Sequence, residues 1–199
     1  MRLTEKQRAI VLGTLLGDGC LERNGKHVRL RLEHGISQKS YLLWKYKELK
    51  SVITGSVMKV YAYHKVNKRT YDSLRTYTYS DLVFDFYWDL FYADTGRKKV
   101  PKNIRLLLNN PLSIAVWFMD DGYKRNDCNA FRFGTDSFSK NDQLMLRSVL
   151  KKNFGIDTQL HKKGKYWNIY IPERESRRFA DLIQPFIIPT LSYKIALTP

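Results

Sequence analysis

The chain is short of acidic residues and of cysteine. It has 19 Asp and Glu against 35 Lys and Arg in 199 residues, which gives a formal net charge of +16 at pH 7. A chain usually keeps such an excess because it meets a polyanion, so we expect nucleic acid as the partner ahead of an anionic membrane surface. Two cysteines, Cys20 and Cys128, are too few for a disulfide scaffold or a cysteine-rich zinc site.

Long apolar runs are also missing. No stretch reaches the roughly 18 to 20 residues that a membrane-spanning helix needs, and the N-terminus has no signal-peptide core. The lack of a Gly-Lys-Ser/Thr phosphate loop disfavours a nucleoside triphosphatase. The four histidines, His27, His34, His64 and His161, lack the spacing of a metal-bound ββα nuclease core. With 43% hydrophobic residues, we expect a folded protein that is neither secreted nor embedded in a membrane.

The sequence contains one pattern twice. In the first half, a capping box over Thr4-Glu5-Lys6-Gln7 opens an apolar helix that ends at Gly17-Asp18-Gly19. In the second half, Asn110-Pro111 opens an apolar helix that ends at Asp120-Asp121-Gly122. Either motif alone could simply end a helix. The matched pair, about half the chain apart, indicates an internal duplication.

The segments after each motif repeat as well. Residues 20–34 predict a hairpin that turns at Asn24-Gly25, with Val28, Leu30 and Leu32 on one face and Arg29, Arg31 and Glu33 on the other. For the rest of the first half we expect a helix over 37–52, strands over 57–63 and 70–79, and a helix over 81–91. For the second half we expect a strand over 131–133, a helix over 140–153 capped by Ser139, a hairpin over 158–171 that turns at 162–165, and a helix over 175–186. Each half therefore reads α-β-β-α-β-β-α, an α+β fold of two pseudo-symmetric halves over 1–95 and 111–199 with a basic linker at 96–110.

The two motif aspartates are candidates for a metal site. A carboxylate at a helix C-terminus meets the negative end of the helix dipole, and a bound cation would reverse that cost. Gly13 and Gly17 let two helices approach closely, which would bring Asp18 and Asp121 to the same end. The second motif has valine where the first has Gly13, so close packing there should rely on Ala115. Two carboxylates suit a hard divalent ion, Mg²⁺ above all.

At these residues the chain resembles a known family. Val11–Gly19 and Ile114–Gly122 are similar to the two motifs of single-chain LAGLIDADG homing endonucleases. The second half, from Val100-Pro101 through Thr135–Phe138 to Tyr193-Lys194, is most similar to the omega-intron branch of that family. The resemblance implies a monomer whose two halves pack through the motif helices, each half with a saddle-shaped antiparallel sheet that binds DNA.

The resemblance also implies which residues act. The acid before each motif's last glycine binds the catalytic metals, which points to Asp18 and Asp121 and to two or three Mg²⁺ ions shared between two sites. Gly17 and Asp120 are further metal-site candidates, although a structural role stays open for Asp120. One basic residue near the end of each half completes each site, namely Lys98 and Lys194, with Lys99 as a rival to Lys98.

Outward residues on the strands suit base reading in the DNA major groove. We expect few acids near Arg29 and Arg31. The candidates are Arg29, Arg31, Lys59, Tyr61, Tyr63, Tyr71, Arg75 and Tyr77 in the first half and Arg132, Gln159, His161, Lys163 and Asn168 in the second. Lys39 and Lys124 resemble polar residues that line the site in some single-chain relatives, and a plain surface contact is equally open for them. Because the halves differ at nearly every outward position, we expect an asymmetric target.

The expected function is that of a site-specific DNA endonuclease. It would make a double-strand break in a long, asymmetric site by Mg²⁺-dependent phosphodiester hydrolysis, and the resemblance implies short 3′ overhangs. The alternative is a nuclease-inactive or bifunctional intron maturase that binds intron RNA, or a nucleic-acid-binding regulator of the same family. The retained acids and lysines favour the enzyme. The expected location is a bacterial cytoplasm or an organelle, according to where the host intron or intein lies.

Overall fold

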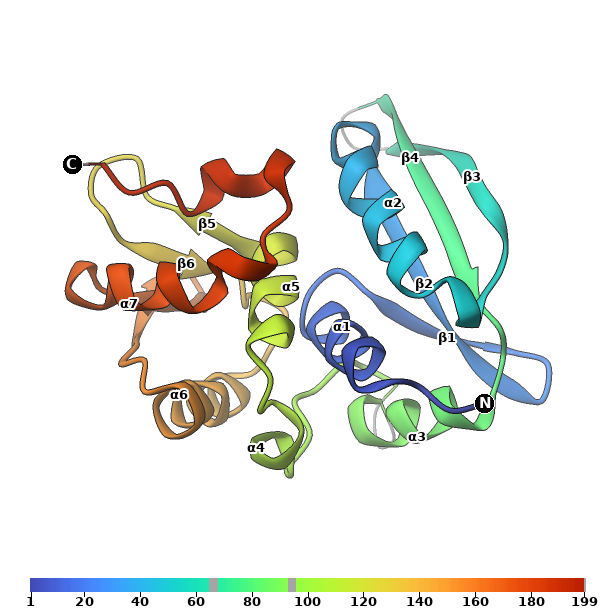
Figure 1. The fold of residues 1–199 in the computed structure, drawn as a ribbon, viewed down its shortest axis with the longest axis horizontal. Coiled ribbons are helices and arrows are strands. Elements are labelled where there is room, and N and C mark those ends of the chain that lie inside the picture. Colours follow the sequence, from blue (N-terminus) through green and yellow to red (C-terminus); the bar gives the residue numbers. More distant parts are fainter. Residues whose placement is uncertain (65–67, 93–95, 199) are drawn as a thin grey trace. The chain divides into compact units, whose positions relative to one another are not determined.

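The computed structural model describes residues 1–64, 68–92 and 96–198, without the side chains of Ala62, His64, Arg69 and Lys163. By their contacts these residues form two compact units (Figure 1). Unit 1 comprises Met1–Arg8 and Asp18–Trp88, and unit 2 comprises Ala9–Gly17 and Asp89–Pro199. The first motif helix therefore groups mainly with the second half of the chain.

Helix α1 (Glu5–Leu16) begins where the capping box predicts. The Thr4 hydroxyl accepts a hydrogen bond from the Gln7 backbone N–H at 3.2 Å, and the Gln7 side-chain oxygen accepts one from the Thr4 N–H at 3.1 Å. These bonds satisfy two donors that a helix N-terminus otherwise leaves open. Gln7 also donates to the Ser51 hydroxyl at 2.8 Å, which ties this end of the helix to unit 1.

Unit 1 is built on one antiparallel sheet. Its strands are β1 (Cys20–Asn24), β2 (His27–Gly35), β3 (Ile53–His64) and β4 (Arg69–Thr78), in the order β1-β2-β4-β3. Its helices are α2 (Lys39–Glu48), between the 3₁₀ turns Ile36–Gln38 and Lys50–Val52, and α3 (Leu82–Phe91). Buried residues alternate with partly exposed ones along β2, as predicted, and α2 lies along this sheet (Figure 1).

The first hairpin turns one residue later than predicted. Asn24 pairs with His27, so Gly25 and Lys26 are the two central residues of the turn. Gly25 has φ +65°, a conformation that glycine adopts without the clash a side chain would cause. The glycine therefore takes the first central position, and Asn24 ends the strand. Of the turn expected between the strands over 57–63 and 70–79, residues 65–67 lie outside the described residues.

Unit 2 repeats the architecture. After α5 (Pro111–Asp121) come β5 (Gly122–Lys124), β6 (Phe131–Phe133), α6 (Lys140–Phe154), β7 (Gln159–Lys163), β8 (Tyr166–Ile171) and α7 (Glu173–Ile183). The sheet order is β5-β6-β8-β7, the same as in unit 1, with α6 against β8 and α7 against α5 (Figure 1). The 3₁₀ turns Gln184–Phe186 and Pro189–Lys194 follow α7. The predicted α+β class and the repeated α-β-β-α-β-β-α order of elements along the chain are confirmed.

Local signals fix the helix ends of unit 2. The Asn110 side chain accepts from the Leu112 N–H at 2.9 Å, with Pro111 as the first helical residue. Ser139 and Asp142 form a reciprocal capping box at the start of α6. The linker predicted over 96–110 contains a short helix, α4 (Ile104–Leu107). Asn153 of α6 donates to the Leu108 carbonyl at 2.8 Å, which holds the end of that short helix.

The motif helices meet within unit 2 at the two glycines of α1. A Cβ placed on Gly13 would lie 2.7 Å from the Val116 Cβ, and one placed on Gly17 would lie 2.5 Å from the Asp120 Cβ. Backbone therefore packs directly against the side chains of α5, which is buried from Leu112 to Asp120. The expectation that Ala115 makes the close contact was wrong, because Val116 itself fills the space that Gly13 leaves.

None of the helices in the described ranges combines the length and the apolar character that crossing a bilayer requires.

Candidate active site and nucleic-acid face

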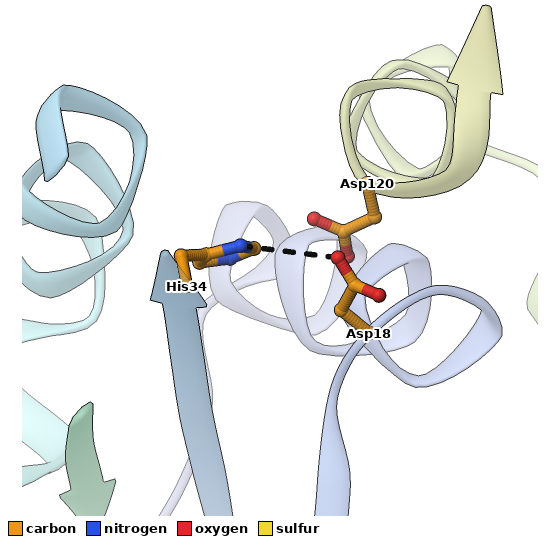
Figure 2. Close-up of side chains that lie close together, drawn as sticks. All are labelled: Asp18, His34 and Asp120. Carbon is orange, nitrogen blue, oxygen red and sulfur yellow. Dashed lines mark ion pairs between the residues drawn. The ribbon is translucent and has the colours of Figure 1, made fainter. Parts of the chain in front are cut away.

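Asp18 follows α1 directly and lies beside His34 in unit 1. The Asp18 Oδ2 atom is 3.8 Å from the His34 Nδ1 atom, and the two side chains face each other in Figure 2. The Asp18 side chain is 45% exposed, whereas that of His34, at the end of β2, is 2% exposed. The spacing of the histidines argued only against a ββα nuclease core, and sequence reasoning missed this neighbour of Asp18. The signal was present in the alternation of β2, which puts His34 on the buried face with Leu30 and Leu32.

A buried polar chain continues behind His34. Its Nδ1 atom lies 3.0 Å from the Gln38 Oε1 atom, and its Nε2 atom lies 3.2 Å from the Lys45 ammonium nitrogen. Lys45, from α2, has no exposed surface, and its ammonium also lies 4.4 Å from the centre of the Tyr41 ring. No sequence pattern singled out this lysine, because its burial depends on how α2 packs on β2.

In unit 2, Asp120 and Asp121 end α5. The Asp120 side chain projects from the end of that helix (Figure 2), is 8% exposed and fills the space beside Gly17. Asp121 is partly exposed, and its backbone carbonyl accepts from the Gly134 N–H at 2.9 Å. Aligned by motif, Gly17 matches Asp120 and Asp18 matches Asp121. Asp120 therefore packs at the helix contact itself, a position where the first motif needs a glycine.

The two predicted lysines make matching contacts within unit 2. The Lys98 ammonium donates to the Gly17 carbonyl at 2.7 Å, and the Lys194 ammonium donates to the Met119 carbonyl at 2.6 Å. Lys194 is buried, while Lys98 is partly exposed. Each ammonium thus lies against the last turn of a motif helix, whose carbonyls carry partial negative charge. The rival Lys99 pairs through its backbone N–H with the Phe91 carbonyl at 2.8 Å.

The outer face of the first sheet carries arginine–glutamate pairs. Arg29 donates to Glu22 at 2.8 Å across the β1–β2 hairpin, and Arg75 donates to Glu33 at 2.8 Å across β2 and β4. Burial alone would raise the pKa of Glu33, but the hydrogen bonds from Arg75 and Ser73 lower it overall. The expectation of few acids near Arg29 and Arg31 was wrong, because both glutamates lie directly across from arginines in the strand register.

Strand register also divides the residues proposed to read DNA in β3 and β4. Lys59 pairs with Leu74 and Tyr61 with Asp72, so odd-numbered positions of β3 share a face with even-numbered positions of β4. Lys59, Tyr61 and Tyr63 therefore face away from the side that carries Arg75, Tyr77 and the exposed Tyr71. The expectation that all of these residues lie on one outer face of the sheet was wrong. Tyr61 and Tyr63 are still well exposed, and Lys59 pairs with Asp72 at 2.8 Å.

On the second sheet, Arg132, Gln159 and His161 lie on one face. The His161 and Tyr170 rings stack 3.9 Å apart, and burial, with Arg132 and Arg125 nearby, lowers the pKa of His161. Asn168 is on the same face, but the expectation that it is exposed was wrong: neighbouring side chains cover it to 2% exposure. The Lys163 side chain lies outside the described part of the structure.

The two remaining candidates sit at element ends. Lys39 is exposed in the first turn of α2, and the Lys124 ammonium, at the end of β5, donates to the Thr198 hydroxyl at 2.8 Å.

Comparison with known proteins identifies the family. Residues 8–179 match the LAGLIDADG DNA endonuclease family. The chain is similar to the DNA endonuclease I-ChuI of Chlamydomonas applanata, with 30% identity over 98% of this chain and 97% of that protein. It is 26% identical over 94% of its length to cytochrome b mRNA maturase bI2 of Saccharomyces cerevisiae, of which it spans 46%. Its fold matches that of the homing endonuclease I-WcaI bound to its DNA recognition sequence, with a TM-score of 0.91 at 22% identity over 100% of this chain and 89% of that one.

The family match includes both motif helices and both sheets. Together with the full-length similarity to I-ChuI, it shows that the chain belongs to the LAGLIDADG DNA endonuclease family, with both motifs in one chain.

Proposed function

We propose that this chain makes a double-strand break in a long, asymmetric DNA site by Mg²⁺-dependent hydrolysis of phosphodiester bonds. One observation carries the proposal. At the end of each motif helix, a lysine that follows the last long helix of the same half donates to a backbone carbonyl one or two residues before the motif aspartate. A protein that only binds nucleic acid has no electrostatic need for two such carboxylates among its cations. The paired lysine and aspartate therefore favour catalysis over binding alone.

Asp18 and Asp121 are the proposed metal ligands, with the Gly17 carbonyl and the Asp120 carboxylate as further donors. All four donate oxygen, the ligand atom that Mg²⁺ prefers, and thiolates take no part. Two or three divalent ions shared between two sites fit this number of donors. Such ions, when bound, supply an activated water and stabilise the charge on the phosphate and on the leaving oxygen.

The lysines have a distinct role in this proposal. Lys98 and Lys194 hold a positive charge at the end of each motif, where it stabilises the negative charge that develops on the attacked phosphate. Their bonds to Gly17 and Met119 fix each ammonium in place before DNA arrives. Because Lys194 is buried, water screens its charge less than it would at the surface.

Double-stranded DNA is the proposed partner of both sheets. I-ChuI is named as a DNA endonuclease, and I-WcaI binds a DNA recognition sequence. The outer faces support this partner, because Arg29 and Arg75 in unit 1 and Arg132 in unit 2 carry guanidinium groups, which bind phosphates and guanine edges. The two faces carry different residues, which favours an asymmetric target over a palindrome. Because the chain carries a net charge of +16, we expect its affinity for DNA to fall steeply as the salt concentration rises. For each phosphate contact, log K should fall by about 0.9 for every unit of log salt concentration.

The test is cleavage of a plasmid that carries the uninterrupted host-gene junction. We expect linear DNA in the presence of Mg²⁺ and intact plasmid with EDTA. Asp18→Asn and Asp121→Asn should each abolish cleavage and leave DNA binding unchanged, because each removes a metal ligand but keeps the side-chain volume. A variant that still cuts both strands would remove its residue from the metal site.

The second candidate function is that of an intron maturase, which the similarity to maturase bI2 favours. Intact plasmid under all metal conditions, together with tight binding of the wild-type protein to folded intron RNA, would support that function instead. Cleavage together with RNA binding would indicate a bifunctional protein.

A further inference from the structure

The outer face of the first sheet holds two glutamates where DNA is proposed to bind. Glu22 lies opposite Arg29 in the register of β1 and β2. Glu33 lies opposite Arg75 in the register of β2 and β4, so all four side chains project from the same face. A carboxylate repels the phosphates of DNA, so its presence on this face lowers the affinity for any sequence. A neutral glutamine could pair with an arginine across the strands without that cost. The two acids therefore need a reason other than strand pairing.

Arg29 is held both at its edge and on its face. Its Nε and Nη2 atoms donate to the Glu22 Oε1 atom at 2.8 and 2.5 Å. Its guanidinium carbon lies 3.8 Å from the centre of the Tyr77 ring. The two hydrogen bonds use two of the five N–H donors of the guanidinium, so both terminal nitrogens keep a donor for another partner. The side chain is 25% exposed, which leaves it accessible to DNA.

Arg75 is held in a similar way. Its Nε atom donates to the Glu33 Oε2 atom at 2.8 Å, and its Nη1 atom donates to the Tyr77 hydroxyl at 3.4 Å. The Glu33 carboxylate is itself fixed, because its Oε1 atom accepts from the Ser73 hydroxyl at 2.6 Å. Tyr77 thus contacts both arginines, and each arginine has its own glutamate.

Arg31 joins the two pairs into one network. Its Nη1 atom lies 3.5 Å from the Glu22 Oε2 atom, and its Nε atom lies 3.8 Å from the Glu33 Oε2 atom. Single exposed ion pairs contribute little to stability, whereas a connected network of arginines and carboxylates can hold its members in one geometry. The outer face of this sheet therefore presents guanidinium groups whose planes are set before DNA arrives.

A fixed guanidinium suits a base better than a phosphate. Guanine presents its O6 and N7 atoms side by side in the major groove, and both accept from the two parallel donors of one arginine. That contact requires the guanidinium to lie in the plane of the base. A phosphate accepts from many directions, and a nearby carboxylate weakens its attraction to the arginine. The glutamates thus lower the attraction to phosphate and keep the geometry that guanine requires.

We propose that Glu22 and Glu33 are positioning residues that hold Arg29 and Arg75 for bidentate contacts to guanines in the part of the DNA target that unit 1 contacts. The proposal rests on double-stranded DNA as the partner in the proposed function, and it does not depend on cleavage. The two glutamates lower the affinity for DNA in general and increase the discrimination between bases. Specificity of this kind combines a favourable contact to the right base with a penalty for other contacts.

Unit 2 carries different residues at the matching positions. By strand register, Arg132 of β6 corresponds to Arg31 of β2. The position of Glu33 is then taken by Gly134, and that of the other glutamate by Arg125. In the part of the chain that the structure describes, the Nε atom of Arg132 has no hydrogen-bond partner. We therefore expect guanine discrimination by glutamate-held arginines from unit 1.

Selection by binding measures base preference without cleavage. The full chain selects duplexes, in the presence of EDTA, from a library randomised around the uninterrupted host-gene junction. The wild type should retain guanines at the positions that Arg29 and Arg75 contact. Glu22→Gln and Glu33→Gln should each lose the preference at the position of the arginine that they release, while their affinity for unselected duplexes stays equal or rises.

A modified base tests the contact at the level of one atom. 7-Deazaguanine lacks the N7 acceptor but still pairs with cytosine. At a selected guanine it should weaken wild-type binding about tenfold, and binding by the matching glutamate variant by less than about threefold. Arg29→Lys and Arg75→Lys keep the charge but lack the planar pair of donors, so each should respond as weakly as the matching glutamate variant.

A matched control separates positioning from the loss of an acid elsewhere. Glu48 of α2 pairs with Lys6 of α1 at 2.6 Å, and Glu48→Gln should keep the wild-type guanine preference. Partial unfolding would lower the affinity for all sequences alike, so it cannot imitate a lost preference. A wild type without guanine preference, or glutamate variants that keep the wild-type response to 7-deazaguanine, would overturn the proposal. A wild type that selects guanines but never cuts would refute the proposed cleavage and leave this proposal standing.

Discussion

The ammonium nitrogen of Lys98 lies 2.7 Å from the carbonyl oxygen of Gly17. Lys194 repeats this relationship with Met119 at 2.6 Å, although its position in the sequence is far from that of Lys98. Both lysines thus reach the last turn of a motif helix from the end of their own half of the sequence. The duplication therefore extends beyond the motifs to the residues that attach to them.

Substitution of these lysines should separate catalysis from folding. Lys98→Met and Lys194→Met keep the aliphatic chain and remove the charge, and each should slow cleavage about 100-fold while DNA binding changes little. The measurement is single-turnover cleavage of a labelled duplex. Lys99→Met is the matched control and should remain close to the wild-type rate. The reverse result, with Lys99→Met inactive and Lys98→Met active, would move the assignment by one residue.

The glycine contact of the motif helices should be intolerant of a methyl group. Gly13→Ala would place a Cβ atom 2.7 Å from the Val116 Cβ, so we expect a loss of about 1–3 kcal/mol in the free energy of unfolding. Gly35→Ala is the control, because a Cβ there would come no closer than 3.9 Å to the Ser37 hydroxyl oxygen. Denaturant unfolding measures both variants, and equal stability of the two would contradict this packing.

The arginine–glutamate pairs should limit DNA affinity. Glu33→Gln removes the charge that holds Arg75, which frees the guanidinium for phosphate or base contacts. Since exposed pairs of this kind contribute at most about 1 kcal/mol, we expect binding to tighten by up to about fivefold. Fluorescence anisotropy at several salt concentrations measures the change. Glu5→Gln, at the exposed start of α1, serves as the control for net charge, and an equal gain there would show that Arg75 is not involved.

Tyr87 should make stability sensitive to alkaline pH. Burial raises the pKa of its phenol from 10.0 to about 12, against a small opposing effect of Arg8. The folded protein keeps this proton up to a higher pH than the unfolded chain, so its contribution is complete below pH 10 and is lost as the pH rises towards 12. Thermal unfolding between these pH values should show a smaller decline for Tyr87→Phe than for the wild type. Tyr61→Phe, at an exposed position, should decline as the wild type does.

Local sequence signals predicted the elements well. The caps at Thr4, Asn110 and Ser139 are short-range devices, and the structure has all of them. The alternation along β2 likewise follows from the geometry of a single strand. These features depend on neighbours in the chain, which a sequence displays directly.

Features that depend on distant pairing could not be predicted. The register of β3 on β4 includes a shift between Thr54 and Met58, and it decides the face on which Lys59 and Tyr61 lie. The glutamate partners of Arg29 and Arg75 follow from the same kind of cross-strand pairing. His34 and Lys45 come from a strand and a helix whose packing fixes their contact, so neither drew attention alone. The roles of Asp18, Asp121 and the two lysines in catalysis stay predictions.

Ala9–Gly17 lies in the first half of the sequence but groups with the second half by its contacts, so removing the first half also removes α1 from α5. Expressing residues 96–199 by themselves would deprive α5 of the glycine-bearing helix that packs against it. The freed surface around Val116 and Asp120 is otherwise buried, and it would be open to aggregation. Two separately produced fragments should therefore form the native fold only if they are refolded together. The helix α1 thus belongs to the first half by sequence and groups mainly with the second half by its contacts.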